Sequence, residues 1–164
     1  MSTEKIDTAN NNLTYNALSN SEGARDLLTI VIAGQRFGIP ILQVQDVLGE
    51  QRVTKIPLAP PEVAGSLNLR GRIVTAINVR KRLGLERAEG KQTNMSVVVE
   101  HEGELYSLII DEIGDVMRLH NRDFKPTPGT LDPVWREISS GVYRLEEELL
   151  VVLDVPKFLN TVHS

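Results

Sequence analysis

The chain has 164 residues, of which 41% are hydrophobic and 24% charged, so it can form one compact domain or two very small ones that share a core. Its net charge of −4 and pI near 5.4 argue against general nucleic-acid binding, which needs a basic face. No run of about 18 apolar residues could cross a bilayer, so membrane insertion is not expected. Only 4% of the residues are aromatic, so the core must consist mainly of Val, Ile and Leu.

The N-terminal stretch from residue 1 to about 25 is polar and rich in Asn, Ser, Thr and Glu. We expect a flexible tail here and a folded domain over residues 26–160. The tail has no apolar core of a secretory signal, and the chain contains no cysteine for disulfide or thiolate chemistry. Both features suit a cytoplasmic protein.

Two β-like runs open the folded region: "LLTIVIA" from Leu27 and "RFGIPI" from Arg36, separated by a predicted turn at Ala33-Gly34-Gln35. Pro40 would interrupt a central strand, so it is expected at an edge or a bend. The next stretch, "ILQVQDVLG", alternates apolar and polar residues as a half-buried strand does.

A proline-rich connection, "QRVTKIPLAPPEVAG", follows, with a short helical turn expected after Pro60-Pro61. The stretch "RIVTAINV" is predicted to be a buried strand. It leads into "RKRLGL", which reads as a short turn of helix that ends near Gly84.

The same plan then repeats along the chain. "SVVVEHEGELYSLIIDEIGDVM" from Ser96 lies over the segment from Leu27 without a gap, and "GVYRLEEELLVVLDVPKFL" lies over "GSLNLRGRIVTAINVRKRL". The matched pairs are Gly34 with Gly103, Phe37 with Tyr106, Val44 with Ile113, Gly65 with Gly141, Arg70 with Glu146, and Asn78 with Asp154. Two aligned blocks in the same order indicate an internal duplication.

Each repeat supplies four to five short strands, a number that suits a small SH3-like β-barrel. We therefore expect an all-β protein with short helices and two barrel subdomains, the first over about 26–90 and the second over about 91–160. An exchange of strands between the barrels is left open. Either barrel alone would have a marginal core, and the apolar seam between the two is a natural place for a ligand or partner.

No constellation of catalytic residues stands out, and no metal or cofactor site is expected. His101, His120 and His163 have no metal-ligand spacing among them and are expected at the surface. Asp111 and Glu112 are adjacent, so on a strand they would point to opposite faces, and we expect them to be exposed. The glutamates at 146–148 are expected at a hairpin tip, and Trp135 is expected to anchor a loop to the core.

Basic residues cluster between positions 70 and 87, namely Arg70, Arg72, Arg80, Lys81, Arg82 and Arg87. They can form an ordinary solvated face or a patch that attracts an acidic partner. A nucleic-acid site would also need stacking aromatic residues among these charges, and the segment has none.

Two stretches, "FGIPILQVQDVL" and "VTKIPLAPPEVAGSLNLRGRIVTAINVRKRLGL", resemble the CheW family of bacterial chemotaxis coupling proteins. The Gly-x-x-Asn-Leu-Arg-Gly element before an apolar strand is the most distinctive feature. In the second half, "LIIDEIGDVMRL" and "LLVVLDVPKFL" extend the resemblance to about residue 160. Two departures are Thr75, where the family often has proline, and Asn78, where it often has aspartate.

The resemblance implies a cytoplasmic, non-catalytic scaffold that is recruited to receptor arrays. It would link methyl-accepting chemoreceptors, through their cytoplasmic tip, to the regulatory domain of the CheA histidine kinase. The receptor tip would dock between the subdomains, and the kinase would pair through the barrel ends. Carried over by motif, the receptor-binding residues are Val44, Gly65, Asn68 and Arg70; the residues that contact the kinase stay unassigned.

The heptapeptide "GSLNLRG" suits such a role. Gly65 and Gly71 allow conformations that a Cβ would hinder, and Asn68 can brace the turn through the local backbone. Arg70 has an apolar stem and a forked head that can reach a carboxylate or a helix carbonyl of a partner. The alternative is that Asn68 and Arg70 only tie the loop to its own barrel.

Other readings stay open. The protein can serve an array other than that of flagellar taxis, since the same surfaces would be used, or it can be a small ligand-binding barrel or enzyme with perturbed carboxylates near Asp111 or Asp115. A receiver-domain fusion and a kinase fragment are not expected, given the end at residue 164 and the start at Met1. The sequence alone identifies neither the particular receptors and kinase nor whether rings form with the kinase or with other copies.

Overall fold

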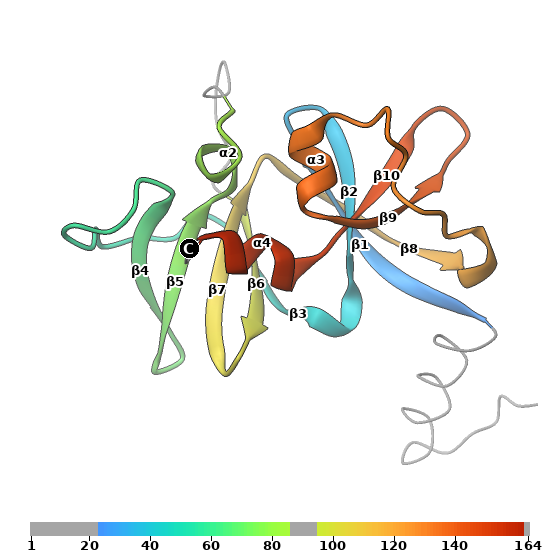
Figure 1. The fold of residues 1–164 in the computed structure, drawn as a ribbon. Helices are drawn as coiled ribbons and strands as arrows, with labels where there is room; N and C mark the ends of the chain where they lie inside the picture. Colours follow the sequence, from blue (N-terminus) through green and yellow to red (C-terminus); the bar gives the residue numbers. More distant parts are fainter. Residues whose placement is uncertain (1–22, 86–94, 163–164) are drawn as a thin grey trace, which may run out of the picture.

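The computed structural model describes residues 23–85 and 95–162. The tail expected over residues 1–25 lies outside these ranges as far as residue 22, and so do Arg87 and His163. The first strand begins at Ala24, just before the expected start of the folded domain. Strands joined by short helices make up the described chain (Figure 1), which confirms the all-β fold class.

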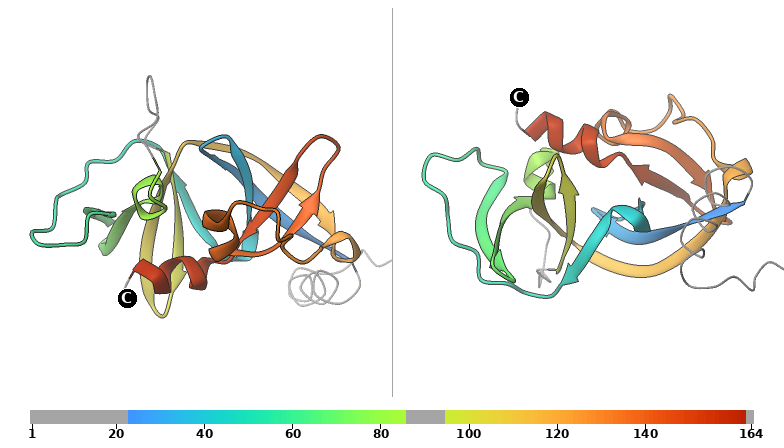
Figure 2. Two further views of the ribbon diagram at one scale, coloured as in Figure 1. Left: turned by 45° about the horizontal axis from the view of Figure 1, so that its top comes forward. Right: turned by 90° about the horizontal axis from the view of Figure 1, so that it is seen from below.

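The strands form two five-stranded sheets. The first sheet contains β1 (Ala24–Ile32), β2 (Gln35–Pro40), β8 (Glu112–His120), β9 (Ser139–Arg144) and β10 (Leu149–Leu153), paired in the order β8-β1-β2-β10-β9. The second sheet contains β3 (Val44–Leu48), β4 (Val63–Leu69), β5 (Arg72–Asn78), β6 (Met95–His101) and β7 (Glu104–Ile110), paired in the order β3-β6-β7-β5-β4. Each sheet is strongly curved, as expected for SH3-like subdomains (Figure 2).

The two repeats exchange their hairpins. The hairpin β1–β2 joins three strands of the second repeat, and the hairpin β6–β7 joins three strands of the first. β10 lies parallel to β2, with Val151 beside Phe37, and β5 lies parallel to β7, with Thr75 beside Tyr106. The two sheet orders become identical when each strand is replaced by its counterpart in the other repeat. The sequence boundary near residue 90 therefore divides the two repeats, but each sheet contains strands from both of them.

Matched turns connect the matched strands. Ala33-Gly34 joins β1 to β2 and Glu102-Gly103 joins β6 to β7, and all four residues have positive φ. Two consecutive positive φ values are the signature of the type I′ turn, whose twist suits a two-residue hairpin. The predicted turn at Ala33-Gly34-Gln35 is therefore confirmed at its first two residues, and Gln35 already belongs to β2.

The helices are short: η2 (Ile41–Gln43), α2 (Val79–Arg82), η3 (Asn121–Asp123), α3 (Pro133–Glu137) and α4 (Val155–Val162). α2 confirms the predicted helix that ends near Gly84. The short helical turn expected after Pro60-Pro61 is present only as a single hydrogen-bonded turn, in which Val63 donates its N–H to the Pro60 carbonyl at 2.9 Å before it enters β4. The strand predicted from residue 41 begins only at Val44, since η2 carries the chain from one sheet to the other after Pro40.

The same capping residue starts a helix after the last strand of each repeat. Asn78 Oδ1 accepts the Lys81 N–H at 3.1 Å at the start of α2, and Asp154 Oδ1 accepts the Lys157 N–H at 3.0 Å at the start of α4. Short polar side chains at this position satisfy a backbone donor that the helix leaves free. Asn78 and Asp154 are matched in sequence, so the duplication extends to the helix caps.

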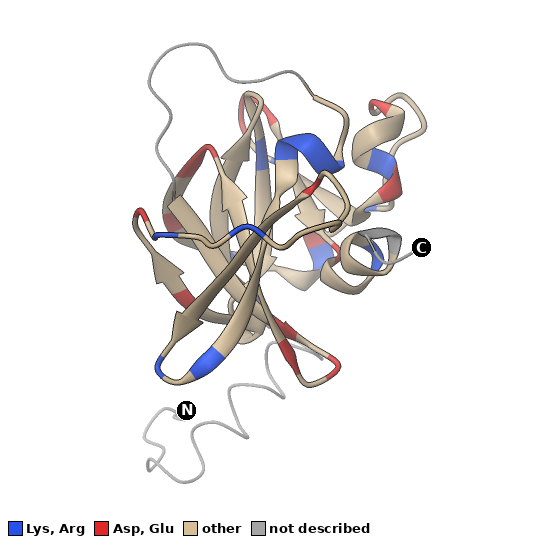
Figure 3. Cartoon of the chain, turned by 90° about the vertical axis from the view of Figure 1, so that its left-hand side faces the viewer, with Lys and Arg blue, Asp and Glu red and all other residues tan. Residues whose placement is uncertain are grey.

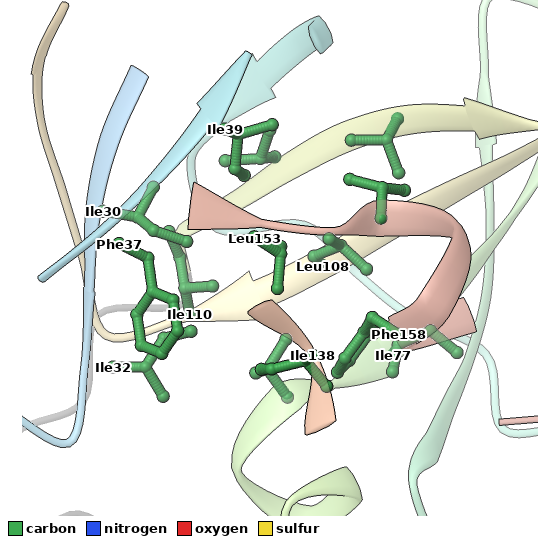
Figure 4. Close-up of a cluster of buried hydrophobic side chains, with 14 of the residues drawn as sticks. Ile30, Ile32, Phe37, Ile39, Ile77, Leu108, Ile110, Ile138, Leu153 and Phe158 are labelled. Atoms are coloured by element: carbon green, nitrogen blue, oxygen red, sulfur yellow. The ribbon is translucent and has the colours of Figure 1, made fainter. Parts of the chain in front are cut away.

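One hydrophobic cluster joins the two sheets. It contains Ile30 and Phe37 from the first sheet and Ile77 and Leu108 from the second, all completely buried (Figure 4). The Trp135 ring of α3 meets Phe37 edge to face, with 5.1 Å between ring centroids, which confirms that Trp135 anchors its loop to the core. Because the cluster draws on both sheets, we expect the two subdomains to unfold together.

An ion pair fastens the second sheet to the first hairpin. Arg80 of α2 donates to both carboxylate oxygens of Asp111, with Nη2 at 2.7 Å from Oδ2, and Oδ2 also accepts the Ala33 N–H at 2.8 Å. Burial alone would raise the pKa of Asp111, but the hydrogen bonds from Arg80 and Ala33 and the charge of Arg80 outweigh it, so the pKa is lowered. The expectation that Asp111 is exposed is therefore wrong: its side chain is 22% exposed.

Replacing Phe37 by Ala should lower the free energy of unfolding by about 3–5 kcal/mol, because it removes a completely buried ring and the partner of Trp135. Urea denaturation followed by fluorescence and circular dichroism should still give one shared transition. The exposed Val116→Ala is the control, with a change within about 0.5 kcal/mol. Separate transitions for the two probes would contradict a core shared by both sheets.

Replacing Asp111 by Asn should lower the free energy of unfolding at pH 7 by about 1–2 kcal/mol. A carboxyl whose pKa is lowered in the folded state stabilises the fold above its unfolded pKa of about 3.9, and this contribution is lost as the pH falls through the folded pKa. The difference between wild type and variant, measured by urea denaturation, should be constant from pH 7 to 5 and shrink below pH 4. A free-energy difference that grows as the pH falls would contradict a lowered pKa of Asp111 in the folded state.

Candidate partner-binding site

The β4–β5 hairpin carries the distinctive heptapeptide at its tip. Arg70 and Gly71 form the turn with φ of +52° and +85°, again the two consecutive positive values of a type I′ turn. Asn68 Oδ1 accepts the Gly71 N–H at 3.0 Å, which confirms that Asn68 braces the turn. The side chain of Asn68 is exposed, so its outer face remains open to solvent.

Arg70 reaches from this turn to the opposite edge of the sheet. Its Nη2 lies 2.8 Å from Asp46 Oδ2, and Asp46 belongs to β3, whereas β4 is the strand at the other edge. The arginine side chain is 75% exposed and the aspartate 24% exposed. In the free protein Arg70 therefore ties the hairpin to its own barrel, which is the alternative that the sequence left open. Most of the Arg70 side chain still faces water.

Gly65 is buried and shapes the start of the same hairpin. It has a φ of +150°, and a Cβ there would collide with the Thr54 carbonyl and lie 2.6 Å from Val53 Cγ1. The close approach lets Thr54 and Ser66 exchange two backbone hydrogen bonds of 2.8 Å. Since Gly65 is buried, its contribution to a partner site is the conformation of β4.

The second repeat uses a glycine in the same way. Gly141 has a φ of +158°, a Cβ there would collide with the Phe124 ring, and Lys125 and Val142 exchange two backbone hydrogen bonds of 2.9 Å. Gly65 and Gly141 are matched in sequence. The physical requirement for glycine is therefore part of the fold of each repeat.

Val44 lies where the chain passes from the first sheet into the second. It is half-buried, packs against the main hydrophobic cluster and faces Val99 of β6. Leu42 just before it and Val47 on the same strand are exposed apolar side chains, and so is Ile73 beyond the hairpin turn. We call Leu42, Val44, Val47, Arg70 and Ile73 the β3–β5 surface.

Of the four predicted site residues, Val44 and Arg70 have accessible side-chain surface on or beside β3, Asn68 supports the turn, and Gly65 supports the strand beneath it. Sequence reasoning missed Asp46 as the partner of Arg70. The alternating pattern placed Asp46 on a strand, but nothing in the sequence said that this strand and the β4–β5 turn meet. The exposure of Ile73 was also missed, because an apolar strand reads as buried throughout.

The members of the basic cluster between Arg70 and Arg82, which the structure describes, do not form one face. Arg80 is held by Asp111, and the Arg82 guanidinium lies 5.6 Å from the centre of the buried Phe158 ring. Arg72 donates to the Gly103 carbonyl at 3.4 Å near the neighbouring turn. The arrangement argues against a continuous basic surface of the kind that nucleic acids require.

The acidic and histidine residues do not converge either. Within residues 23–85 and 95–162, no three His, Cys, Asp or Glu side chains are placed to hold a metal ion. His101 ends β6 with its Nε2 3.3 Å from Asn160 Oδ1, and His120 ends β8 with an exposed side chain. None of the helices in the described residues is both long and apolar enough to span a membrane.

Comparison with known proteins agrees with this architecture. A family model described as the CheW-like domain matches residues 26–163. A chemotaxis protein CheW from Treponema pallidum is 30% identical, with 82% of this chain and 82% of that protein covered. Protein PilI from Pseudomonas aeruginosa is 28% identical, with 73% of this chain and 67% of that protein covered.

A solved structure extends the similarity to the fold. The scaffolding protein TtCheW from Thermoanaerobacter tengcongensis has a TM-score of 0.70 and 26% identity, with 79% of this chain and 88% of that chain covered. The match and the family model both cover the two exchanged sheets rather than one of them. The chain belongs to the CheW-like domain family.

Proposed function

We propose that this protein is a cytoplasmic adaptor without catalytic activity that couples methyl-accepting chemoreceptors to the CheA histidine kinase. Membership of the CheW-like family supports this proposal, as do relatives named chemotaxis protein CheW and a structural neighbour named a scaffolding protein. The ion pair that holds Asp111 supports it too, because Asp111 is one of the two carboxylates, with Asp115, that a catalytic barrel would have used.

The observation that carries the receptor half of the proposal is the exposed Arg70–Asp46 pair. The Arg70 side chain is 75% exposed, so its guanidinium can donate to an acceptor on a partner while Nη2 stays beside Asp46, whose Oδ2 is buried. Its stem can meanwhile lie over apolar side chains such as those of Leu42 and Val47. We assign the receptor tip to the β3–β5 surface, with Gly65 and Asn68 holding the hairpin in place.

The kinase half of the proposal uses the ends of the subdomains. The kinase's regulatory domain, which the family resemblance gives the same fold, would pair end to end with this protein, and the receptor tip would lie across the passage between the sheets. The two partners would then bind at the same time. Recruitment to receptor arrays follows from these contacts and needs no membrane insertion.

A second candidate is an adaptor of an array that serves a process other than flagellar taxis. The similarity to PilI favours keeping it, because that relative does not carry the chemotaxis name. The same two surfaces would be used, and only the partners would differ. Titration of the protein with each CheA-type kinase that the same cell encodes distinguishes the two candidates, because they differ in the kinase that the protein binds.

Titration of the purified protein with the regulatory domain of a CheA kinase from the same cell tests the proposal. We expect saturable binding of one protein to one domain in isothermal calorimetry. No binding between two folded partners, repeated with each CheA-type kinase of the cell, would overturn the coupling function and leave only the fold assignment.

Replacing Arg70 by Glu should weaken binding of a receptor cytoplasmic hairpin by about tenfold or more, because it sets two acids together and removes the forked donor. The variant should remain folded, with a fall in melting temperature of about 2–4 °C, because the largely buried Asp46 then faces a second carboxylate. The double variant Arg70→Glu with Asp46→Arg is the control, since it restores the internal ion pair with the charges exchanged.

The double variant separates the two roles of Arg70. If Arg70 contacts the receptor, the double variant stays weak in the same calorimetric titration. Recovery of wild-type affinity would show that only the internal tie matters and would remove Arg70 from the contact surface.

A further inference from the structure

The loop over residues 49–62, which joins β3 to β4, presents a leucine in an unusual conformation. Ala59 donates its N–H to the Ile56 carbonyl at 3.3 Å, and Leu58 has a φ of +65°. With Pro57 at the second position and positive φ at the third, this is the pattern of a type II turn, which favours Gly or Asn where Leu58 stands. A residue with a Cβ is disfavoured in this left-handed conformation.

The conformation places the leucine entirely in water. The Leu58 side chain is fully exposed, and the neighbouring Ile56 is exposed as well. The left-handed backbone conformation opposes folding, and the exposed side chain contributes no buried apolar area that would offset it. Such a combination on an ordered loop indicates a selected contact rather than a requirement of the fold.

The second repeat serves as an internal control. The corresponding connection, between β8 and β9, forms α3 and folds back onto its own barrel, where Trp135 packs on Phe37 and Leu131 and Val134 pack against the main cluster. The connection in the first repeat contains no helix; Val53 packs against the second sheet, but Ile56 and Leu58 are exposed. The two connections share a place in the fold, so the first one presents to another molecule what the second one buries.

The charge of the loop indicates the partner. Arg52 and Lys55 are exposed, and neither forms an ion pair with the described residues. Glu50 and Glu62 balance their charge over residues 49–62, but these acids lie at the two ends of the loop, whereas the two cations lie just before the apolar turn. The whole chain by contrast has a net charge of −4. Figure 3 views this end of the molecule directly, and the loop crosses the front with two basic segments. An apolar tip preceded by two cations fits an apolar pocket with acidic groups on the adjoining part of its rim.

The position of the loop selects between the two partners. It extends beyond β4 at the outer end of the second sheet, away from the first sheet (Figures 1 and 2). Val44 of the receptor surface lies instead where the chain crosses between the sheets. A partner that meets the molecule end to end therefore contacts the loop.

We propose that the turn at Ile56–Ala59 is an anchor that inserts Leu58 into an apolar, acid-rimmed pocket on the kinase's regulatory domain. This inference rests on the proposed function and adds to it a specific contact residue. Arg52 and Lys55 pair with the acidic rim, so the contact is sensitive to salt.

The variant Leu58→Asn tests the anchor, because its effects on stability and on binding have opposite signs. Asn tolerates the left-handed conformation, so the melting temperature should rise by about 2–4 °C. Affinity for the kinase's regulatory domain should fall by about tenfold or more in calorimetry, because the side chain that fills the pocket is lost. The matched control Leu58→Met keeps the apolar side chain and should retain affinity within about threefold.

The double variant Arg52→Gln with Lys55→Gln tests the rim. Its affinity should fall, and the dependence of its affinity on salt between 50 and 500 mM NaCl should be shallower than that of the wild type, as expected when about two charge contacts are removed. An unchanged salt dependence would overturn the acidic rim.

Three results would overturn the anchor. If Leu58→Asn binds the regulatory domain as the wild type does, Leu58 is not a contact, although the coupling function stands. If the wild type itself does not bind, the coupling function and the anchor both fail. If Leu58→Asn instead loses binding to vesicles of anionic phospholipid and keeps kinase binding, the loop meets a membrane surface and not a protein.

Discussion

The parallel contacts between repeats, β2 with β10 and β5 with β7, are the constraint on which the rest of the structure depends. Neither repeat can complete a sheet by itself, because its first hairpin is seated in the sheet of the other. The exchange brings Phe37, Ile77 and Leu108 into one cluster and places η2 and Val44 at the crossing. Two domains too small to be stable alone thereby become one unit, and a partner that binds across the passage between the sheets meets a rigid frame.

The duplication provides this frame and divergence provides the binding surfaces. Each repeat has a glycine that allows a close backbone approach, Gly65 or Gly141, and a polar residue that caps a helix, Asn78 or Asp154. At the surface the repeats differ: Arg70 stands where the second repeat has Glu146, and the connection that buries Trp135 in one repeat exposes Leu58 in the other. A protein with two similar halves would offer the same site twice, whereas one with divergent surfaces can hold two different partners at once.

The sequence predicted local features well, because they depend on neighbouring residues. The hairpin turn at Ala33-Gly34 and the brace from Asn68 both follow from turn chemistry. The ion pairs Arg70–Asp46 and Arg80–Asp111 could not be predicted, because each joins segments that only the exchanged sheets bring together. The positive φ of Leu58 was not predicted, because a type II turn normally has Gly or Asn at the position where Leu58 stands.

The central claim is that one copy of this protein holds a receptor and a kinase simultaneously through separate surfaces. The most direct measurement is analytical ultracentrifugation of the protein with a receptor cytoplasmic hairpin and the CheA regulatory domain, each pair first and then all three. A protein with two separate surfaces should form a ternary complex in which each partner binds as tightly in the presence of the other as alone. Displacement of one partner by the other would mean that they share a surface, and the coupling account would be contradicted.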